Sequence, residues 1–455
     1  MAPALLRGRW IDDWRPEDET FWQRTGKRIA NRNLWFSVFS EHIGFSIWTL
    51  FSVLVLFMGP DYGIDAAGKF LLVSVATFVG AALRLPYSLA VAVVGGRNWT
   101  VISAALLLVP TILLAVFMEP GTSYTTLVVI SALVGLGGGN FASSMTNINA
   151  FFPDRAKGAA LGINAGGGNL GVAVIQLVGL LIIATAGPDA PRLLLAVYIP
   201  LIVLSLAGAA LFMDNISSVR NDGGALKEAA RDAQTWVMAF LYIGTFGSFI
   251  GYSFAFGLVL QNQFGRTPLQ AAAVTFIGPL LGSLIRPVGG WLSDRVGGVR
   301  VTFWNFAAMA VSTVICIAAS GIDSLALFTV GFVLLFITSG IGNGSTYKMI
   351  PSIFRTKALA ATEERGWDQE TALLWARRIS GAAIGITAAV GAFGGLLINL
   401  AFRSSFQSTQ SGAPAFWAFL VFYAACMVVT FAVYMRSATA ATDPTTGTRV
   451  SYAEV

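Results

Sequence analysis

Two arginines lie in the middle of apolar stretches, where a membrane-spanning helix rarely carries a permanent charge. Arg84 lies eleven residues before Gly95, and Arg286 lies eleven residues before Gly297. On a helix that rises about 1.5 Å per residue, each arginine is then roughly 16 Å from the helix end, about half of a ~30 Å hydrocarbon core. A guanidinium at that depth costs on the order of several kcal/mol unless a partner compensates its charge.

The sequence offers no fixed carboxylate as the partner of these arginines. Apart from Glu41, every Asp and Glu falls in a loop or at the edge of an apolar stretch. The compensating group is therefore expected to be a mobile anion, and the planar fork of guanidinium donors suits a planar oxyanion. The alternative is an arginine that backbone carbonyls hold, or one whose long side chain reaches the membrane interface.

The elements that position the arginines are apolar stretches of membrane-spanning length. Hydrophobic residues make up 55% of the chain and charged residues 11%, against about 25% charged residues in soluble proteins. The stretches lack the period-two alternation of β-barrel strands. We predict an all-α integral membrane protein with twelve transmembrane helices, at approximate positions 34–58, 68–94, 99–118, 125–153, 157–186, 191–213, 234–261, 268–295, 299–319, 324–354, 377–402 and 413–436.

The twelve predicted helices form two halves that repeat one another. Gly80-Ala-Ala-Leu-Arg84 is echoed by Gly282-Ser-Leu-Ile-Arg286, and Gly95-Gly96 by Gly297-Gly298 at the same offset of 202, while Gly138-Gly139-Asn140 recurs loosely near Gly342-Asn343. Parallel six-helix repeats are the architecture of the major facilitator superfamily, whose substrate site lies near the membrane midplane. The predicted division is an N-terminal segment 1–33, a first half 34–213, a linker 214–233, a second half 234–436 and a tail 437–455.

The basic residues predict the orientation of these helices. Of the 29 Lys and Arg residues, four fall in outer loops (Lys69, Arg192, Arg266 and Arg403), three fall within helices (Arg84, Arg286 and Lys348), and the rest fall in segments on the opposite side. Because cytoplasmic loops of membrane proteins carry the excess of Lys and Arg, we expect both termini in the cytoplasm. Residues 1–33 lack the apolar core of a cleaved signal peptide.

Glycines gather at helical spacing in three of the predicted helices. Small residues at i and i+4 let helix backbones approach closely, and runs such as Gly166-Gly167-Gly168-Asn169-Leu170-Gly171 are too rich in glycine for a static helix. We expect these residues at contacts that move during function, although close packing without motion is the alternative. The candidates are Gly139, Gly162, Gly166, Gly167, Gly171, Gly391, Gly394 and Gly395.

Polar and aromatic residues within the helices are candidates for contact with an anion. Buried amides need partners, so Asn140, Asn147, Asn169 and Asn343 either donate to an anion or tie helices together. Phe45, Phe141, Tyr242 and Phe246 either wall a narrow cavity or simply pack.

Other chemistry has little support in this sequence. Cys316 and Cys426 lie singly in apolar runs, no cluster has the spacing of metal ligands, and His42 is the one histidine. We therefore expect no metal, no cofactor, no enzymatic activity and no nucleic-acid partner. Glu41 and His42 are the only candidates for proton coupling, and we favour instead an interfacial feature near the start of the first helix.

Several motifs resemble the nitrate/nitrite porter family of the major facilitator superfamily. GGGNFASSMTNINAFFP at 137–153 is similar to its nitrate signature, ALGINAGGGNLG at 160–171 continues the pattern, and GNGSTYKMIP at 342–351 and GAFGG at 391–395 resemble the C-terminal copy. DWRPED at 13–18 and RNLW at 32–35 resemble bacterial members, so the resemblance covers nearly the whole chain. Lys348 departs from the family, and we expect it to reach the inner interface or to recruit anions there.

The resemblance implies a function and a set of residues that perform it. It places the anion-binding arginines at Arg84 and Arg286, with Phe141, Asn169, Tyr242 and Phe246 around them. It implies a bacterial inner-membrane transporter of nitrate and nitrite, which we expect to be monomeric and to exchange the two anions by alternating access. Proton-coupled nitrate uptake through Glu41 and His42 is the alternative, and a channel or a membrane sensor is a more distant one. We expect the loop after the eighth helix to carry a structural latch of Asp294 and Arg295.

Overall fold

The computed structural model describes residues 9–219, 222–437, 439–442, 449–453 and 455, so parts of the predicted N-terminal segment and tail lie outside the described residues. Within this range, twelve helical segments are long and apolar enough to cross a membrane, which confirms the predicted fold class. They are Glu19–Phe57, Ala66–Val94, Gly96–Phe117, Tyr124–Phe151, Arg155–Ala186, Pro191–Phe212, Ala233–Phe264, Pro268–Val296, Gly298–Gly321, Leu325–Ala360, Gln369–Thr409 and Ala413–Met435.

The helices extend beyond the apolar stretches that predicted them, because polar caps rather than hydropathy set where a helix ends. The side chain of Asp18 accepts a hydrogen bond from the backbone N–H of Phe21, and the first helical segment therefore begins well before the predicted position 34. Asp368 caps the eleventh segment in the same way, and hydrogen bonds from the hydroxyl and then from the backbone N–H of Thr371 lower the pKa of its carboxyl group.

The chain forms two compact units. The first contains the described residues up to 219 together with residues 253–280, and the second contains residues 222–252 and those from 281 onward. Residues 253–280, which the predicted division places in the second half, make their contacts in the first unit. Gln176 donates a hydrogen bond of 2.8 Å to the carbonyl of Ser253, and Trp48 packs edge-on against Phe254.

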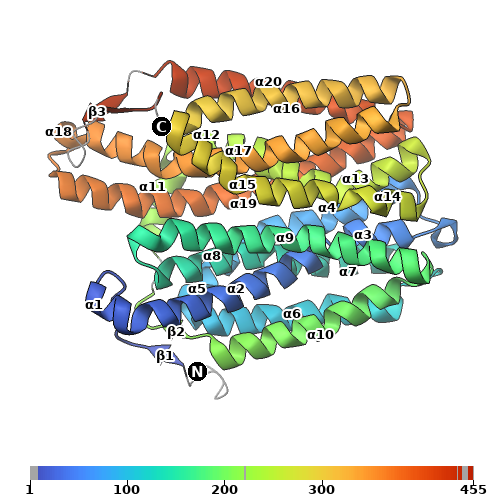
Figure 1. Cartoon of the computed structure of the whole chain (residues 1–455), viewed down its shortest axis with the longest axis horizontal. Coiled ribbons are helices and arrows are strands. Elements are labelled where there is room, and N and C mark those ends of the chain that lie inside the picture. Colours follow the sequence, from blue (N-terminus) through green and yellow to red (C-terminus); the bar gives the residue numbers. More distant parts are fainter. Residues whose placement is uncertain (1–8, 220–221, 438, 443–448, 454) are drawn as a thin grey trace. The chain divides into compact units, whose positions relative to one another are not determined.

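Helices make up most of the first unit. They are α1 (Glu19–Phe21), η2 (Trp22–Gly26), α2 (Lys27–Trp48), α3 (Leu50–Phe57), α4 (Ala66–Ala82), α5 (Arg84–Val94), α6 (Gly96–Phe117), α7 (Tyr124–Val134), η4 (Gly135–Gly139), α8 (Asn140–Phe151), α9 (Asp154–Ala186), α10 (Pro191–Phe212) and α14 (Pro268–Thr275). Along this unit α2 packs against α9, and α6 lies beside α10 (Figure 1).

The second unit repeats these pairings. Its elements are α11 (Gly223–Arg231), α12 (Ala233–Tyr242), η5 (Ile243–Gly247), α15 (Ile277–Val296), α16 (Gly298–Gly321), α17 (Leu325–Ala360), α18 (Thr362–Arg365), α19 (Gln369–Thr409), α20 (Ala413–Thr430) and η6 (Phe431–Met435), and α13 (Ser248–Phe264) begins within it. Here α12 and η5 pack against α19, and α16 lies beside α20 (Figure 1). The pairings of the first span with the fifth and of the third with the sixth thus recur six spans later, as a six-helix repeat requires.

Polar segments close one end of each unit. Strand β1 (Trp10–Ile11) pairs in parallel with β2 (Asn215–Ile216), and Asp214 beside it forms ion pairs with Arg9 and Arg32. In the second unit, β3 (Ala440–Thr442) pairs with β4 (Arg449–Ser451), and the backbone N–H of Val299 donates to the carbonyl of Val455.

The predicted linker 214–233 is partly helical. It contains α11, whose N-cap residue Asp222 accepts hydrogen bonds from Arg378 on α19 and from the backbone of Ala225. These bonds, the one from Arg378 first, lower the pKa of Asp222 to about 2. The ion pair therefore fixes α11 against α19 at any physiological pH.

Candidate anion-binding site

Arg84 lies at the first residue of α5, just after an interruption in the second membrane-spanning segment. Helix α4 ends at Ala82, and Pro86 follows in the first turn of α5, where the N–H that it lacks has no helical acceptor to lose. The side chain of Arg84 is 1% exposed. The sequence therefore places a permanent cation inside the unit, at a turn that proline makes favourable.

Aromatic rings line the guanidinium of Arg84. Its Cζ lies 4.7 Å from the ring centroid of Phe141 and 5.4 Å from that of Trp48. Phe45 packs edge-on against both rings, at 5.9 Å and 5.4 Å. Each cation–π contact stabilises a cation by about 0.5–2 kcal/mol but leaves its positive charge in place, so the arrangement supports a guanidinium that can still attract an anion.

Glycines make room for the Trp48 ring beside Arg84. The Nε1 of Trp48 donates a hydrogen bond of 2.9 Å to the carbonyl of Ala76. A Cβ at Gly80 would overlap this ring, and one at Gly138 would come 2.6 Å from the Cα of Gly80. The repeated glycines thus allow α2, α4 and η4 to approach closely enough to hold Trp48 over the arginine.

Arg286 lies on α15 and is 9% exposed. Its Nη2 donates a hydrogen bond of 3.3 Å to the hydroxyl of Tyr242, and its Cζ lies 5.6 Å from the ring centroid of Tyr347. Tyr242 is the last residue of α12, and its ring stacks on Phe246 at 5.2 Å, almost parallel. The intervening η5 is a π-helical turn, a geometry that often marks functional sites.

The structure brings together some of the predicted site residues within each unit. Arg84 meets Phe141 in the first unit, and Arg286 meets Tyr242, with Phe246 behind it, in the second. Asn169 is buried on α9, and neither polar atom of its amide finds a hydrogen-bond partner among the described residues. An amide in that state is available to a ligand.

Sequence reasoning missed Trp48 and Tyr347, the second aromatic neighbour of each arginine. Both residues have a sequence feature that could have identified them. Trp48 lies one turn after Phe45 in the first span, and a buried Trp needs a partner for its N–H, while Tyr347 lies within the motif GNGSTYKMIP.

Comparison with known proteins agrees with the fold. The Major Facilitator Superfamily model matches residues 34–366. The chain is 39% identical to the nitrate/nitrite transporter NarU of Salmonella typhimurium and 37% identical to that of Escherichia coli, over 94% of this chain and 96% of each relative. It is 31% identical to the probable nitrate/nitrite antiporter NarK2 of Thermus thermophilus, over 94% of this chain and 97% of the relative.

The chain belongs to the major facilitator superfamily. Within it, the similarity along nearly the whole length places the chain in the nitrate/nitrite porter family. Twelve apolar helices and these bacterial relatives make it a multi-pass protein of the inner membrane.

The glycines of this porter divide into those at close contacts and those that face open space. A Cβ would overlap Val38 at Gly167, the carbonyl of His42 at Gly171 and the Tyr242 ring at Gly391. At Gly139 it would come 2.6 Å from the Tyr87 ring, and at Gly394 2.7 Å from the Cα of Gly247. Gly395 is buried, and its carbonyl accepts a hydrogen bond of 2.8 Å from Asn399.

Gly162 and Gly166, together with Gly158 one turn before them, make no close helix contact in this structure. A Cβ at any of the three meets no atom within 4 Å. The packed face of α9 contains Gly167, Gly168 and Gly171 instead, on roughly the opposite side of the helix. The spacing predicted a glycine face but not its rotation, because a run of consecutive glycines fits more than one face.

The interpretation of Glu41 as an interfacial feature of the helix start is also wrong. The helical segment begins at Glu19, and Glu41 is 0% exposed deep within α2. Its Oε2 accepts hydrogen bonds from the Ser144 hydroxyl of α8 and, at 2.6 Å, from the Asn164 amide of α9. His42 Nδ1 lies 3.0 Å from the carbonyl of Gly167. Glu41 therefore joins three helices of the first unit.

The expected latch of Asp294 with Arg295 takes a different form. Asp294 pairs with Lys348 of α17 at 2.7 Å, while the guanidinium of Arg295 lies over the Trp291 ring at 4.1 Å. Lys348, the departure from the family pattern, thus links α17 to α15, with about half of its side chain exposed.

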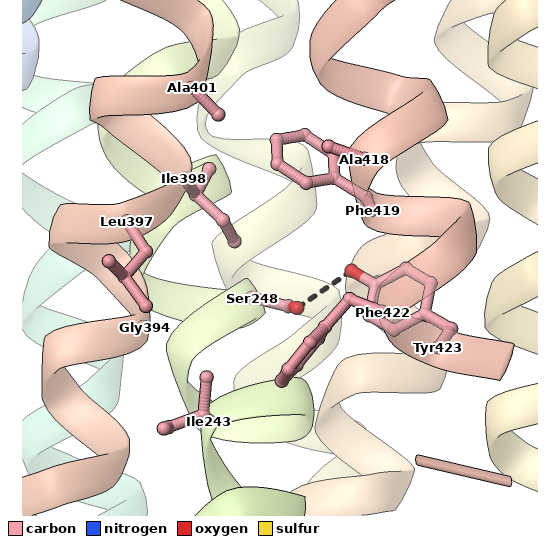
Figure 2. A pocket seen from close by; sticks show the side chains of 10 residues that line it. All are labelled: Ile243, Ser248, Gly394, Leu397, Ile398, Ala401, Ala418, Phe419, Phe422 and Tyr423. Atoms are coloured by element: carbon pink, nitrogen blue, oxygen red, sulfur yellow. Dashed lines mark hydrogen bonds between the residues drawn. The ribbon is translucent and has the colours of Figure 1, made fainter. Parts of the chain in front are cut away.

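A cavity of about 180 Å³ in the second unit lies apart from the arginine (Figure 2). Its lining is apolar except for Ser248 and Tyr423, whose hydroxyls share a hydrogen bond of 2.7 Å. It borders Gly394 and contains no charged residue, so its chemistry does not suit an inorganic anion.

Proposed function

We propose that this chain transports nitrate and nitrite across the bacterial inner membrane. The observation that carries the proposal is the pair of buried arginines at repeat-equivalent positions, each beside aromatic rings, in a chain 39% identical to a nitrate/nitrite transporter over 94% of its length. Guanidinium donors match the planar arrangement of oxygens in both anions. The aromatic rings beside each guanidinium limit the space for an anion, which disfavours the larger tetrahedral ones.

Alternating access is the transport mechanism that the repeat architecture supports. The close glycine contacts, Gly167 and Gly171 against α2 and Gly394 against η5, are surfaces on which helices of one unit can shift without side chains blocking them. We expect the two cytoplasmic termini that the positive-inside distribution predicts, and a monomer as the functional unit.

The proposed coupling is exchange of nitrate for nitrite. With no anion bound, the arginines carry positive charge in a medium of low dielectric constant, so the empty carrier should close unfavourably and return slowly. A bound anion compensates the charge of the arginines, so the loaded carrier can close and reopen toward either side of the membrane. The resemblance to the probable antiporter NarK2 supports the same coupling.

Proton-coupled nitrate uptake is the second candidate, and the buried Glu41 favours it. A carboxyl group within the membrane, bonded to Ser144 and Asn164 on two other helices, is a group that a proton can neutralise. We favour exchange because the positive charge of the arginines already requires an anion in both directions of the cycle.

Reconstituted liposomes distinguish these possibilities. Vesicles loaded with nitrite, and vesicles without it, are given external nitrate with and without a pH gradient. An exchanger takes up nitrate only when internal nitrite is present, a symporter responds to the pH gradient alone, and a channel needs neither. Absence of nitrate flux under every condition would overturn the proposed substrate.

A further inference from the structure

Asn343, on α17, is a buried amide to which the described part of the chain gives no hydrogen-bond partner. Its side chain is 1% exposed, and neither Oδ1 nor Nδ2 forms a hydrogen bond with a described residue. Buried amides are nearly always hydrogen-bonded, because an unsatisfied one destabilises the fold. The amide of Asn343 is therefore a candidate to hydrogen-bond a ligand.

The neighbours of Asn343 fix the direction in which it points. A Cβ at Gly342 would come 2.5 Å from Thr245 of η5, and one at Gly344 would overlap the carbonyl of Arg286 on α15. Ser345 shares a hydrogen bond of 2.8 Å with Thr302 of α16. Consecutive helical residues point about 100° apart, so Asn343 points away from α16, between η5 and α15.

Arg286 of α15 meets Tyr242, the residue directly before η5, in this direction. Tyr347, one turn after Asn343 on the same side of α17, lies 6.0 Å from the Tyr242 ring and 5.6 Å from the Arg286 guanidinium. Nη1 of Arg286 makes no hydrogen bond with a described residue. Arg286 therefore has a cationic donor without a hydrogen bond to a described residue, and the unsatisfied amide of Asn343 points toward the same side of α17 as its neighbour Tyr347.

We propose that Asn343 is a further anion-binding residue, whose Nδ2 donates a hydrogen bond to an oxygen of the anion that Arg286 binds. The inference rests on the proposed function for the identity of that anion. A neutral amide adds a directed donor without adding charge, so it can orient a small oxyanion without holding it too tightly to be released. The ligand class is a small monovalent oxyanion with at least two acceptor oxygens.

Nitrate binding to the purified full-length protein tests this inference. Sodium nitrate is titrated against sodium gluconate, and the Kd is taken from the nitrate-dependent rise in the unfolding temperature. The variants are Asn343→Leu, which removes the donor, and Asn343→Asp, which keeps the shape but places a carboxylate beside Arg286. Asn305→Leu and Asn305→Asp are the matched controls, because Asn305 is a buried amide of the same unit on α16.

We expect Asn343→Leu to weaken nitrate binding about tenfold or more, as the loss of a hydrogen bond to a charged group implies, and Asn343→Asp to weaken it further. The Asn305 variants should stay within about threefold of the unmodified protein. If Asn343→Leu does not fold, Asn343→Ala, which also removes the donor, replaces it with the same expectation.

Two results would count against the inference in different ways. Equal nitrate affinity in the unmodified protein and in the folded Asn343 variants overturns the inference and leaves the proposed function standing. Failure of the unmodified protein to bind nitrate overturns the proposed substrate and the inference together.

Discussion

Nη2 of Arg286 donates its hydrogen bond to Tyr242 at the residue where α12 ends and the π-helical η5 begins. The Tyr242 ring is held from the other side by Gly391 of α19, where any Cβ would overlap it. Helix α19 and the guanidinium of Arg286 therefore contact the same side chain. Arg84 is placed differently, by the faces of Phe141 and Trp48.

Tyr242→Phe tests the hydrogen bond to Arg286. The ring and its packing on Phe246 stay, but the hydroxyl is lost, and a bond of 3.3 Å is expected to contribute about 1 kcal/mol. The KM for nitrate should rise roughly fivefold. Tyr252→Phe is the control, since it removes a buried hydroxyl that bonds to Tyr423. An unchanged KM in Tyr242→Phe would show that the hydroxyl does not position the arginine for the anion.

Arg84→Lys and Arg286→Lys test the need for the guanidinium itself. Lysine keeps the charge but offers neither the bidentate fork nor the flat face that stacks on an aromatic ring. Each variant should insert normally and lose nearly all nitrate uptake in proteoliposomes. Substantial uptake by either correctly inserted variant would remove that arginine from the site.

Both arginines are buried within helices, and the sequence pointed to them because a charge in an apolar stretch at a repeated offset has few explanations. It also predicted that Phe141 and Tyr242 lie beside them, through the family resemblance. It did not predict Trp48 or Tyr347, because an aromatic residue within a membrane helix looks the same in sequence whether it packs on a cation or on another ring.

The sequence could not give the rotation of α9 or the surroundings of Glu41. Four of the six residues from Gly166 to Gly171 are glycines, so the face that packs on α2 depends on tertiary contacts with Val38 and His42. The depth of Glu41 was misjudged because the polar residues before it suggested a helix start, whereas the cap at Asp18 begins the helix earlier.

Gly394→Leu should slow transport by blocking a helix contact in the second unit. The Cα of Gly247 and the carbonyl of Ile243 both lie within 3.0 Å of where a Cβ would stand, and backbone atoms cannot move aside as a side chain can. Overpacking of this kind costs about 1–3 kcal/mol, so the variant should be less stable and turn over slowly. Gly381→Leu is the matched control on α19, because a Cβ there meets nothing within 4 Å. Equal exchange rates for both variants would show that the Gly394 contact does not move.

Nitrate should be selected over sulfate. Two arginines can balance a dianion, so charge is not the filter, whereas the bulk of the Phe141 and Tyr242 rings beside the arginines leaves less room for the larger sulfate. Equimolar sulfate should therefore leave nitrate uptake nearly unchanged, while nitrite should compete. Inhibition by sulfate comparable to that by nitrite would contradict the proposed role of the rings.

Exchange should persist without Glu41 and His42. Glu41→Gln keeps the shape and the oxygen that accepts from Ser144 and Asn164, while it removes the group that could carry a proton. With His42→Gln added, no carboxyl or imidazole group remains at these positions, and the arginines stay protonated at physiological pH. Nitrate–nitrite counterflow in proteoliposomes should therefore continue in the double variant, with or without a pH gradient. If a pH gradient alone drives nitrate into vesicles that contain no nitrite, and the double variant loses that accumulation, then Glu41 or His42 carries protons and the protein is a symporter.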